Sequence, residues 1–134
     1  GLAAACVRQQ SFLLQDQLSP LQKAYFMPQA RFDLLADLRA NAHAAIDISD
    51  GLLADAQHLA QASGVAVNIH SADLKLAEGV ELDDALRGGD DYQLLATADT
   101  PLPGMVSIGQ VIAGSGVSID GVVQQPDGYN HFVA

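Results

Sequence analysis

The chain has 134 residues, enough for one domain with a substantial core but not for two domains. Hydrophobic residues make up 49% of it, which excludes intrinsic disorder. Its net charge of −10 repels phosphate backbones, so we expect no unaided binding to nucleic acid, although divalent cations can bridge such a chain to a phosphorylated ligand.

The single cysteine, Cys6, excludes an internal disulfide and a cysteine-based zinc site. No apolar run approaches the roughly 18 residues that a membrane-spanning helix needs. The first residues lack the basic flank and the long apolar stretch of a signal peptide. We therefore expect a cytoplasmic protein with no membrane partner.

Helices are predicted first in the chain. Residues 2–15 carry apolar side chains at helical spacing. Ser19 and Pro20 are typical of a helix start, and Pro28 ends that second helix. A third helix is predicted over residues 31–39, again from the spacing of its apolar positions.

From Ala44 onward, short apolar strands alternate with helices. The predicted elements are a strand at 44–48, a helix at 50–63 that Gly64 ends, a strand at 65–69, a short helix at 82–86, strands at 92–98 and 106–112, and a hairpin at 117–123 that turns at Asp120-Gly121. This order predicts one α+β domain over residues 1–134, with a helical leading region at 1–42 and an α/β core at 43–134. We expect the core to be a mixed or antiparallel sheet covered by helices.

The segment Asp-Ile-Ser-Asp-Gly at 47–51 lies where a strand is predicted to become a helix. Side chains alternate along a strand, so Asp47 and Ser49 are expected to project the same way, with Asp50 at the turn. Two carboxylates and a hydroxyl suit Mg²⁺, and a helix N-terminus can receive a phosphate oxygen. The alternative is that Ser49 or Asp50 only caps the helix. Against it, Asp47 interrupts an apolar strand, where a buried carboxylate needs a partner or a metal.

A second segment, Gly-Gly-Asp-Asp-Tyr at 88–92, places two acids before a predicted strand. The glycines allow backbone conformations closed to other residues and permit close approach to a ligand. A plain turn with solvated acids is the simpler alternative. Diguanylate cyclases carry a similar Gly-Gly-Asp-Glu-Phe hairpin, but their metal-binding strand is followed by a Phe-Lys pair, and residues 50–53 here are Asp-Gly-Leu-Leu.

The chain closes with Gly-Tyr-Asn-His-Phe at 128–132. An exposed aromatic such as Tyr129 can stack on a flat heterocycle, whereas Phe132 fits a place in the core equally well. The sequence contains neither a Gly-x-x-x-x-Gly-Lys-Ser/Thr loop nor a dinucleotide-binding Gly-x-Gly-x-x-Gly motif. Because its only lysines are Lys23 and Lys75, it offers a transferring phosphoryl group little help beyond candidate metal ligands.

Several separated motifs together resemble thiamine-monophosphate kinases. They are Asp-Ile-Ser-Asp-Gly-Leu at 47–52, Ala-Ser-Gly-Val at 62–65, Gly-Gly-Asp-Asp-Tyr-Gln-Leu at 88–94 and Gly-Tyr-Asn-His-Phe at 128–132, and Pro28 with Arg31 is similar to a Pro-x-x-Arg connector of that family. The resemblance covers nearly the whole chain in the order of the family. It implies a PurM-like C-terminal domain with a three-layer α/β/α architecture.

The resemblance also implies roles for individual residues. Asp47 and Asp50 would be metal ligands, Ser49 would contact ATP, and Asp90 and Tyr129 would contact the thiamine substrate. The usual residue of the family at position 90 is Glu. Asp90 is one methylene shorter, so its contact is expected to be displaced or mediated by water.

For the whole enzyme, the resemblance implies transfer of the γ-phosphoryl group of ATP to thiamine monophosphate, giving thiamine diphosphate, with Mg²⁺ as cofactor. The implied partners are the two substrates, an N-terminal domain of the same protein, and a second copy in a homodimer. In the family that N-terminal domain carries most of the ATP and metal ligands, and the chain has no counterpart of it. We therefore expect the 134-residue polypeptide by itself to lack kinase activity.

Two alternatives stay open. A sister enzyme of the same superfamily, such as aminoimidazole ribonucleotide synthetase, selenophosphate synthetase or the hydrogenase maturation factor, would share the architecture and ATP chemistry but lack the paired motifs at 88–92 and 128–132. A non-catalytic interaction domain, whose acids only cap helices and solubilise, would show no Mg²⁺-dependent change at Asp47 or Asp50.

Overall fold

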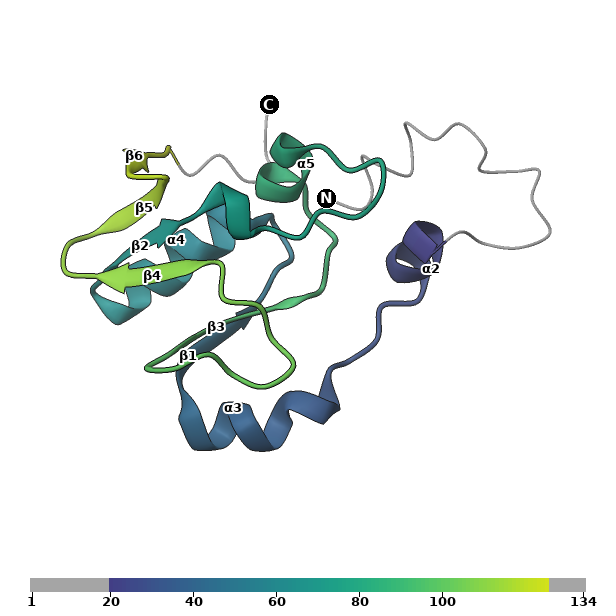
Figure 1. Ribbon diagram of the computed structural model, residues 1–134, viewed down its shortest axis with the longest axis horizontal. Helices are drawn as coiled ribbons and strands as arrows, with labels where there is room; N and C mark the ends of the chain where they lie inside the picture. Colours follow the sequence, from purple (N-terminus) through teal and green to yellow (C-terminus); the bar gives the residue numbers. More distant parts are fainter. Residues whose placement is uncertain (1–19, 126–134) are drawn as a thin grey trace, which may run out of the picture.

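The computed structural model describes residues 20–125, with two sheets and a long helix at their centre (Figure 1). The elements in chain order are α2 (Pro20–Phe26), η1 (Phe32–Leu34), α3 (Leu35–Asn41), β1 (Ala42–Asp47), α4 (Leu52–Ser63), β2 (Ala66–Ile69), η2 (Ser71–Asp73), α5 (Leu82–Arg87), β3 (Leu94–Ala98), β4 (Gly109–Ile112), β5 (Gly116–Ile119) and β6 (Val122–Val123). None of the helices between residues 20 and 125 has the length and apolarity of a membrane span.

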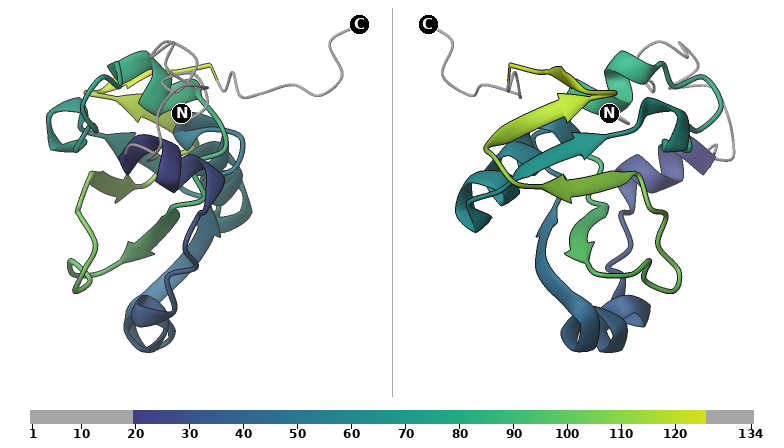
Figure 2. Two further views of the ribbon diagram at one scale, coloured as in Figure 1. Left: turned by 90° about the vertical axis from the view of Figure 1, so that its right-hand side faces the viewer. Right: turned by 60° about the vertical axis from the view of Figure 1, so that its left-hand side comes forward.

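The strands form two separate sheets. β1 and β3 pair antiparallel as a two-stranded ribbon, with Asp47 opposite Leu94. The second sheet has the strand order β4-β2-β5-β6 and is mixed, because β2 runs antiparallel to β4 and parallel to β5. Figure 2 shows the β1–β3 ribbon extending away from the four-stranded sheet, with α3 at its far end.

Helix α4 joins the two sheets into one core. It contacts β1 of the ribbon, β2 and β5 of the larger sheet, and α5. Leu53 and Ala56 on α4 are completely buried, and Ile69 of β2 belongs to the same apolar cluster with 1% of its surface exposed. Burying a side chain of this kind stabilises a fold by roughly 1.5–3 kcal/mol. The N-terminus of α4, where the Asp47 segment lies, therefore rests on a well-packed element.

The α+β class and the mixed sheet with its helices are confirmed, and the separate β1–β3 ribbon adds to them. The predicted helix at 31–39 divides into η1 and α3. The strand predicted at 92–98 begins only at Leu94, because Tyr92 has a φ of 52°, which an extended strand cannot contain. The helix predicted at 2–15 lies outside the described residues.

Two turn predictions are confirmed. Gly64 is the C-cap of α4, with a left-handed φ of 65°, and its N–H donates to carbonyl groups of the last helical turn. Asp120 and Gly121 have φ values of 50° and 80° and join β5 to β6, the pattern of a tight hairpin turn.

Candidate functional site

The two acidic segments singled out in the sequence, 47–51 and 88–92, lie in direct backbone contact. A Cβ on Gly89 would lie 2.5 Å from the carbonyl oxygen of Ser49, and a Cβ on Gly51 would lie 2.9 Å from the carbonyl group of Arg87. Both separations are far inside van der Waals contact, so both positions require glycine. The glycines thus permit two motifs that are distant in the sequence to meet.

Main-chain hydrogen bonds fix this contact. Ile48 N–H donates to the carbonyl of Gln93 at 2.8 Å, and Tyr92 N–H donates to the carbonyl of Ile48 at 2.8 Å. The N–H of Asp90 donates to the carbonyl of Ser49 at 2.9 Å. These bonds continue the β1–β3 pairing past the ends of both strands, so the two acidic segments are held as one unit.

Asp90 and Tyr92 both adopt left-handed backbone conformations. Their φ values are 63° and 52°. The left-handed conformation is less stable by roughly 1–2 kcal/mol for a residue that carries a side chain. Backbone strain of this kind is concentrated at functional sites. The main-chain bonds to Ser49 and Ile48 hold both residues in place. The sequence prediction of a plain strand start at Tyr92 was wrong for this reason.

The side chains of these two residues are joined as well. The Tyr92 hydroxyl donates to Oδ1 of Asp90 at 3.1 Å. This hydrogen bond and the negative charge of Asp90 raise the pKa of Tyr92, and the charge of Asp47 adds a smaller effect in the same direction. Asp90 thus has the main influence on the pKa of Tyr92, and Asp47 of the other acidic segment has a small one.

The structure corrects one argument about Asp47. The sequence suggested a carboxylate buried within an apolar strand, but Asp47 ends β1 and is exposed, because burial alternates along this strand. Its accessible carboxylate needs no buried partner. His43 lies on the same exposed face of β1 as Asp47 and pairs with Asp99, with 3.0 Å between Nε2 of His43 and Oδ1 of Asp99.

The capping alternative for Ser49 and Asp50 is not what the structure shows, because the N-cap residue of α4 is Gly51. A residue that the sequence reasoning missed holds this turn. Asp55, in the first turn of α4, is only 2% exposed, and its Oδ2 accepts the N–H groups of Ser49 at 2.9 Å and Asp50 at 3.0 Å. The signal that could have found it is a single carboxylate within the apolar part of a predicted helix.

The donor set at 47–50 fits a hard divalent cation in part. Asp47 and Asp50 offer carboxylate oxygens and Ser49 offers a hydroxyl, all of which Mg²⁺ accepts. Among residues 20–125, no group of three or more His, Cys, Asp or Glu side chains is placed to hold a metal ion. The segment thus suits a Mg²⁺ ion that takes one or two protein ligands here and completes its coordination from elsewhere.

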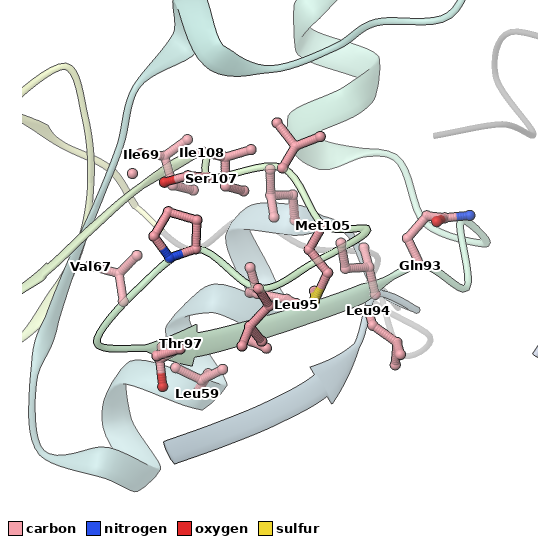
Figure 3. Close-up of a pocket in the computed structure, with 18 of the residues that line it drawn as sticks. Leu59, Val67, Ile69, Gln93, Leu94, Leu95, Thr97, Met105, Ser107 and Ile108 are labelled. Carbon is pink, nitrogen blue, oxygen red and sulfur yellow. The ribbon is translucent and has the colours of Figure 1, made fainter. Parts of the chain in front are cut away.

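A cavity in the described part of the chain borders the acidic segments, because Ile48 and Asp91 are among the residues that line it. It has a volume of about 1190 Å³ and opens between the β1–β3 ribbon and the larger sheet. Figure 3 shows that mostly apolar side chains line it, among them Leu59, Val67, Ile69, Leu95, Met105 and Ile108. None of Asp47, Ser49, Asp50 and Asp90 lines it, so we place the candidate site at the acidic segments, where charge and backbone geometry converge.

The structure therefore brings four of the five predicted site residues to one region, namely Asp47, Ser49, Asp50 and Asp90. Tyr129, the fifth, lies outside the described residues. The side chains of His58 and His70 are 58% and 41% exposed.

The curated relatives compared below are both thiamine-monophosphate kinases. The chain is 40% identical over 130 aligned positions to the thiamine-monophosphate kinase of Aquifex aeolicus, covering 87% of this chain and 42% of that protein. It is 42% identical over 89 positions to the thiamine-monophosphate kinase of Methanopyrus kandleri, covering 57% of this chain and 29% of that protein. No protein-family model matches the chain.

Solved structures agree with these relatives. One described as AaThiL complexed with AMPPCP and TMP superposes with a TM-score of 0.81 and 34% identity, covering 98% of this chain and 47% of that one. Thiamine-monophosphate kinase from Stenotrophomonas maltophilia K279a superposes with a TM-score of 0.76 and 35% identity, covering 92% and 48%. The chain thus spans less than half the length of the relatives it matches.

Proposed function

Because the chain belongs to the thiamine-monophosphate kinase family and corresponds to the C-terminal domain of its members, we propose that it takes part in transfer of the γ-phosphoryl group of ATP to thiamine monophosphate, giving thiamine diphosphate. The observation that carries the proposal is the backbone junction of segments 47–51 and 88–92, which unites an acidic turn with a second acid-bearing segment. Further support comes from a relative bound to TMP and to AMPPCP, an analogue of ATP.

We assign the binding of the metal and the nucleotide to the segment at the end of β1. Asp47 and Asp50 would hold Mg²⁺, and Ser49 would contact ATP. Magnesium at such a place neutralises phosphate charge during in-line transfer. The exposure of Asp47 favours this role, because its carboxylate is accessible to an arriving metal–nucleotide complex.

We assign the binding of thiamine monophosphate, the phosphoryl acceptor, to Asp90 and Tyr129. The carboxylate of Asp90 suits the amino group on the pyrimidine ring of thiamine. The left-handed backbone of Asp90 supports the same role, because strained conformations are concentrated at functional sites. Since one oxygen of Asp90 already accepts the Tyr92 hydroxyl, Tyr92 would orient that carboxylate. Tyr129 would stack on the flat ring.

We propose that an N-terminal domain of the same protein and a second copy in a homodimer complete the enzyme. Four exposed apolar side chains between residues 26 and 35 would be available for such contacts. They are Phe26, Met27, Phe32 and Leu35, exposed by 45%, 67%, 79% and 49%. With a single cysteine available, we also propose a reducing, cytoplasmic setting.

The proposal is tested by titrating Mg²⁺ into the ¹⁵N-labelled chain and following its amide resonances by NMR. We expect the amides of residues 48–52 to shift, and we expect the shifts to be abolished in the double variant Asp47→Asn, Asp50→Asn. Asp73→Asn, which removes an exposed carboxylate of η2, is the control and should respond like the original chain. Unmoved amides from Ile48 to Leu52 would favour a non-catalytic interaction domain.

A second titration, with thiamine monophosphate, distinguishes the proposed enzyme from its sister enzymes. We expect shifts at the Asp90 and Tyr92 amides that the variant Asp90→Ala weakens. A response to Mg²⁺–ATP together with no response to thiamine monophosphate would favour another member of the superfamily.

A further inference from the structure

Asp55 is a buried carboxylate that the proposed chemistry does not use. Its side chain is 3% exposed, and carboxylates are almost never buried to this extent without partners. It lies in the first turn of α4, where the helix dipole favours negative charge. The main-chain N–H of Asp55 also donates to the carbonyl of Gly51 at 3.0 Å, so the residue is fixed to the turn before the helix.

The two oxygens of Asp55 have different partners. Oδ2 accepts both the Ser49 N–H at 2.9 Å and the Asp50 N–H at 3.0 Å. Oδ1 lies 3.6 Å from Nδ1 of His58, one turn further along α4. A carboxylate that accepts backbone N–H groups forms charge-assisted hydrogen bonds, which are stronger than neutral ones. Asp55 thus connects the helix to the backbone of two proposed ligand residues.

The peptide backbone of Ser49 is held from both sides as a result. Its N–H donates to Asp55, and its carbonyl accepts the N–H of Asp90 at 2.9 Å. A backbone fixed at both groups limits the directions that the Ser49 and Asp50 side chains can take. Partners of this kind, which orient metal ligands without touching the metal, affect metal affinity by about 10–100-fold in other proteins.

We propose that Asp55 is a positioning residue for the Mg²⁺–ATP side of the site, acting through the amides of Ser49 and Asp50. The inference rests on the proposed function, since it needs Asp47, Ser49 and Asp50 to bind a metal–nucleotide complex. Replacing Asp55 by Ala removes the acceptor of both N–H groups. Replacing it by Asn keeps one oxygen that can accept them but removes the charge.

The test combines two NMR measurements on the 134-residue chain. Without metal, we expect the Ser49 and Asp50 amide protons to move upfield in Asp55→Ala, because they lose a charged acceptor. With Mg²⁺, we expect the dissociation constant to rise about tenfold or more in Asp55→Ala and less in Asp55→Asn. Asp37→Ala, which removes an acid from the first turn of α3, is the matched control and should change neither quantity.

The outcomes separate the two proposals. If the original chain binds Mg²⁺ and Asp55→Ala binds it equally well while the amides have moved, the positioning role is wrong and the proposed function stands. If the original chain does not respond to Mg²⁺, the metal role in the proposed function fails, and the inference fails with it. Should Asp55→Ala fail to fold, the same comparison is made with Asp55→Asn, and a dissociation constant that is unchanged although the Ser49 and Asp50 amides have moved contradicts the inference.

Discussion

At the scale of single residues, the candidate site depends on side chains that act on their neighbours. Asp55 supports the backbone of Ser49 and Asp50, and Asp90 accepts the Tyr92 hydroxyl. Residue types in the sequence indicated Asp90 as an acid of interest. They did not indicate that Tyr92 would be its partner, because that contact requires the left-handed backbone of both residues.

We predict that Asp90→Asn lowers the pKa of Tyr92 toward its ordinary value of 10.0, because the hydrogen bond weakens and the neighbouring negative charge disappears. Since the folded-state pKa of Tyr92 is raised, the interaction stabilises the folded chain fully below pH 10 and is lost as pH rises through the folded pKa. The measurement is NMR titration of ¹³Cζ-labelled tyrosine, with Tyr92→Phe to assign the signal. An unchanged Tyr92 titration in Asp90→Asn would rule out the Asp90 contact, and Asp73→Asn serves as the control.

At the scale of elements, the turn between β1 and α4 and the turn between α5 and β3 behave as one unit. Gly89 allows this, since a Cβ there would lie 2.5 Å from the carbonyl oxygen of Ser49. We predict that Gly89→Ala lowers the free energy of unfolding by about 1–3 kcal/mol and shifts the Ser49 and Asp50 amides. Urea denaturation and amide spectra measure the two effects.

The matched control is Gly64→Ala at the end of α4. Gly64 has a φ of 65°, and a Cβ there would meet no atom within 4 Å. This variant should lose roughly 1–2 kcal/mol from left-handed strain alone and leave the Ser49 and Asp50 amides in place. If Gly89→Ala behaved in the same way, the close contact between the two turns would be disproved.

The elements differ in how far the sequence could predict them. The span of α4 and its end at Gly64 follow from local apolar spacing and a cap, and both were predicted. The separate β1–β3 ribbon was not, because local periodicity contains no information about which strands pair. Asp55 was missed for a related reason: its role depends on how the preceding turn folds back over the helix.

At the scale of the whole molecule, the chain is acidic, and in the proposed function it would supply one part of a phosphoryl-transfer site. It has 16 acidic residues against six lysines and arginines. Among residues 20–125, no cluster of three metal-ligating side chains forms. Transfer of a phosphoryl group needs positive charge from metals or side chains around the transferred phosphate. In the proposed enzyme, that positive charge would come from bound metal and from another domain.

We predict that the purified 134-residue chain forms no thiamine diphosphate from Mg²⁺–ATP and thiamine monophosphate. Product is measured by chromatography of thiamine phosphates after conversion to fluorescent thiochromes. A full-length relative, such as the Aquifex aeolicus thiamine-monophosphate kinase, provides the positive control. Thiamine diphosphate formed by the 134-residue chain above a no-enzyme blank would contradict the prediction.

The main-chain bonds that join Ile48 and Ser49 to Asp90, Tyr92 and Gln93 close a long loop containing α4, β2 and α5. Closing such a loop costs chain entropy, which the contacts between the two segments must offset. Neither acidic motif holds the site by itself. The two segments form one site only while this loop is closed. The rate of hydrogen exchange at the Asp90 and Tyr92 amides therefore reports the opening of the assembled site.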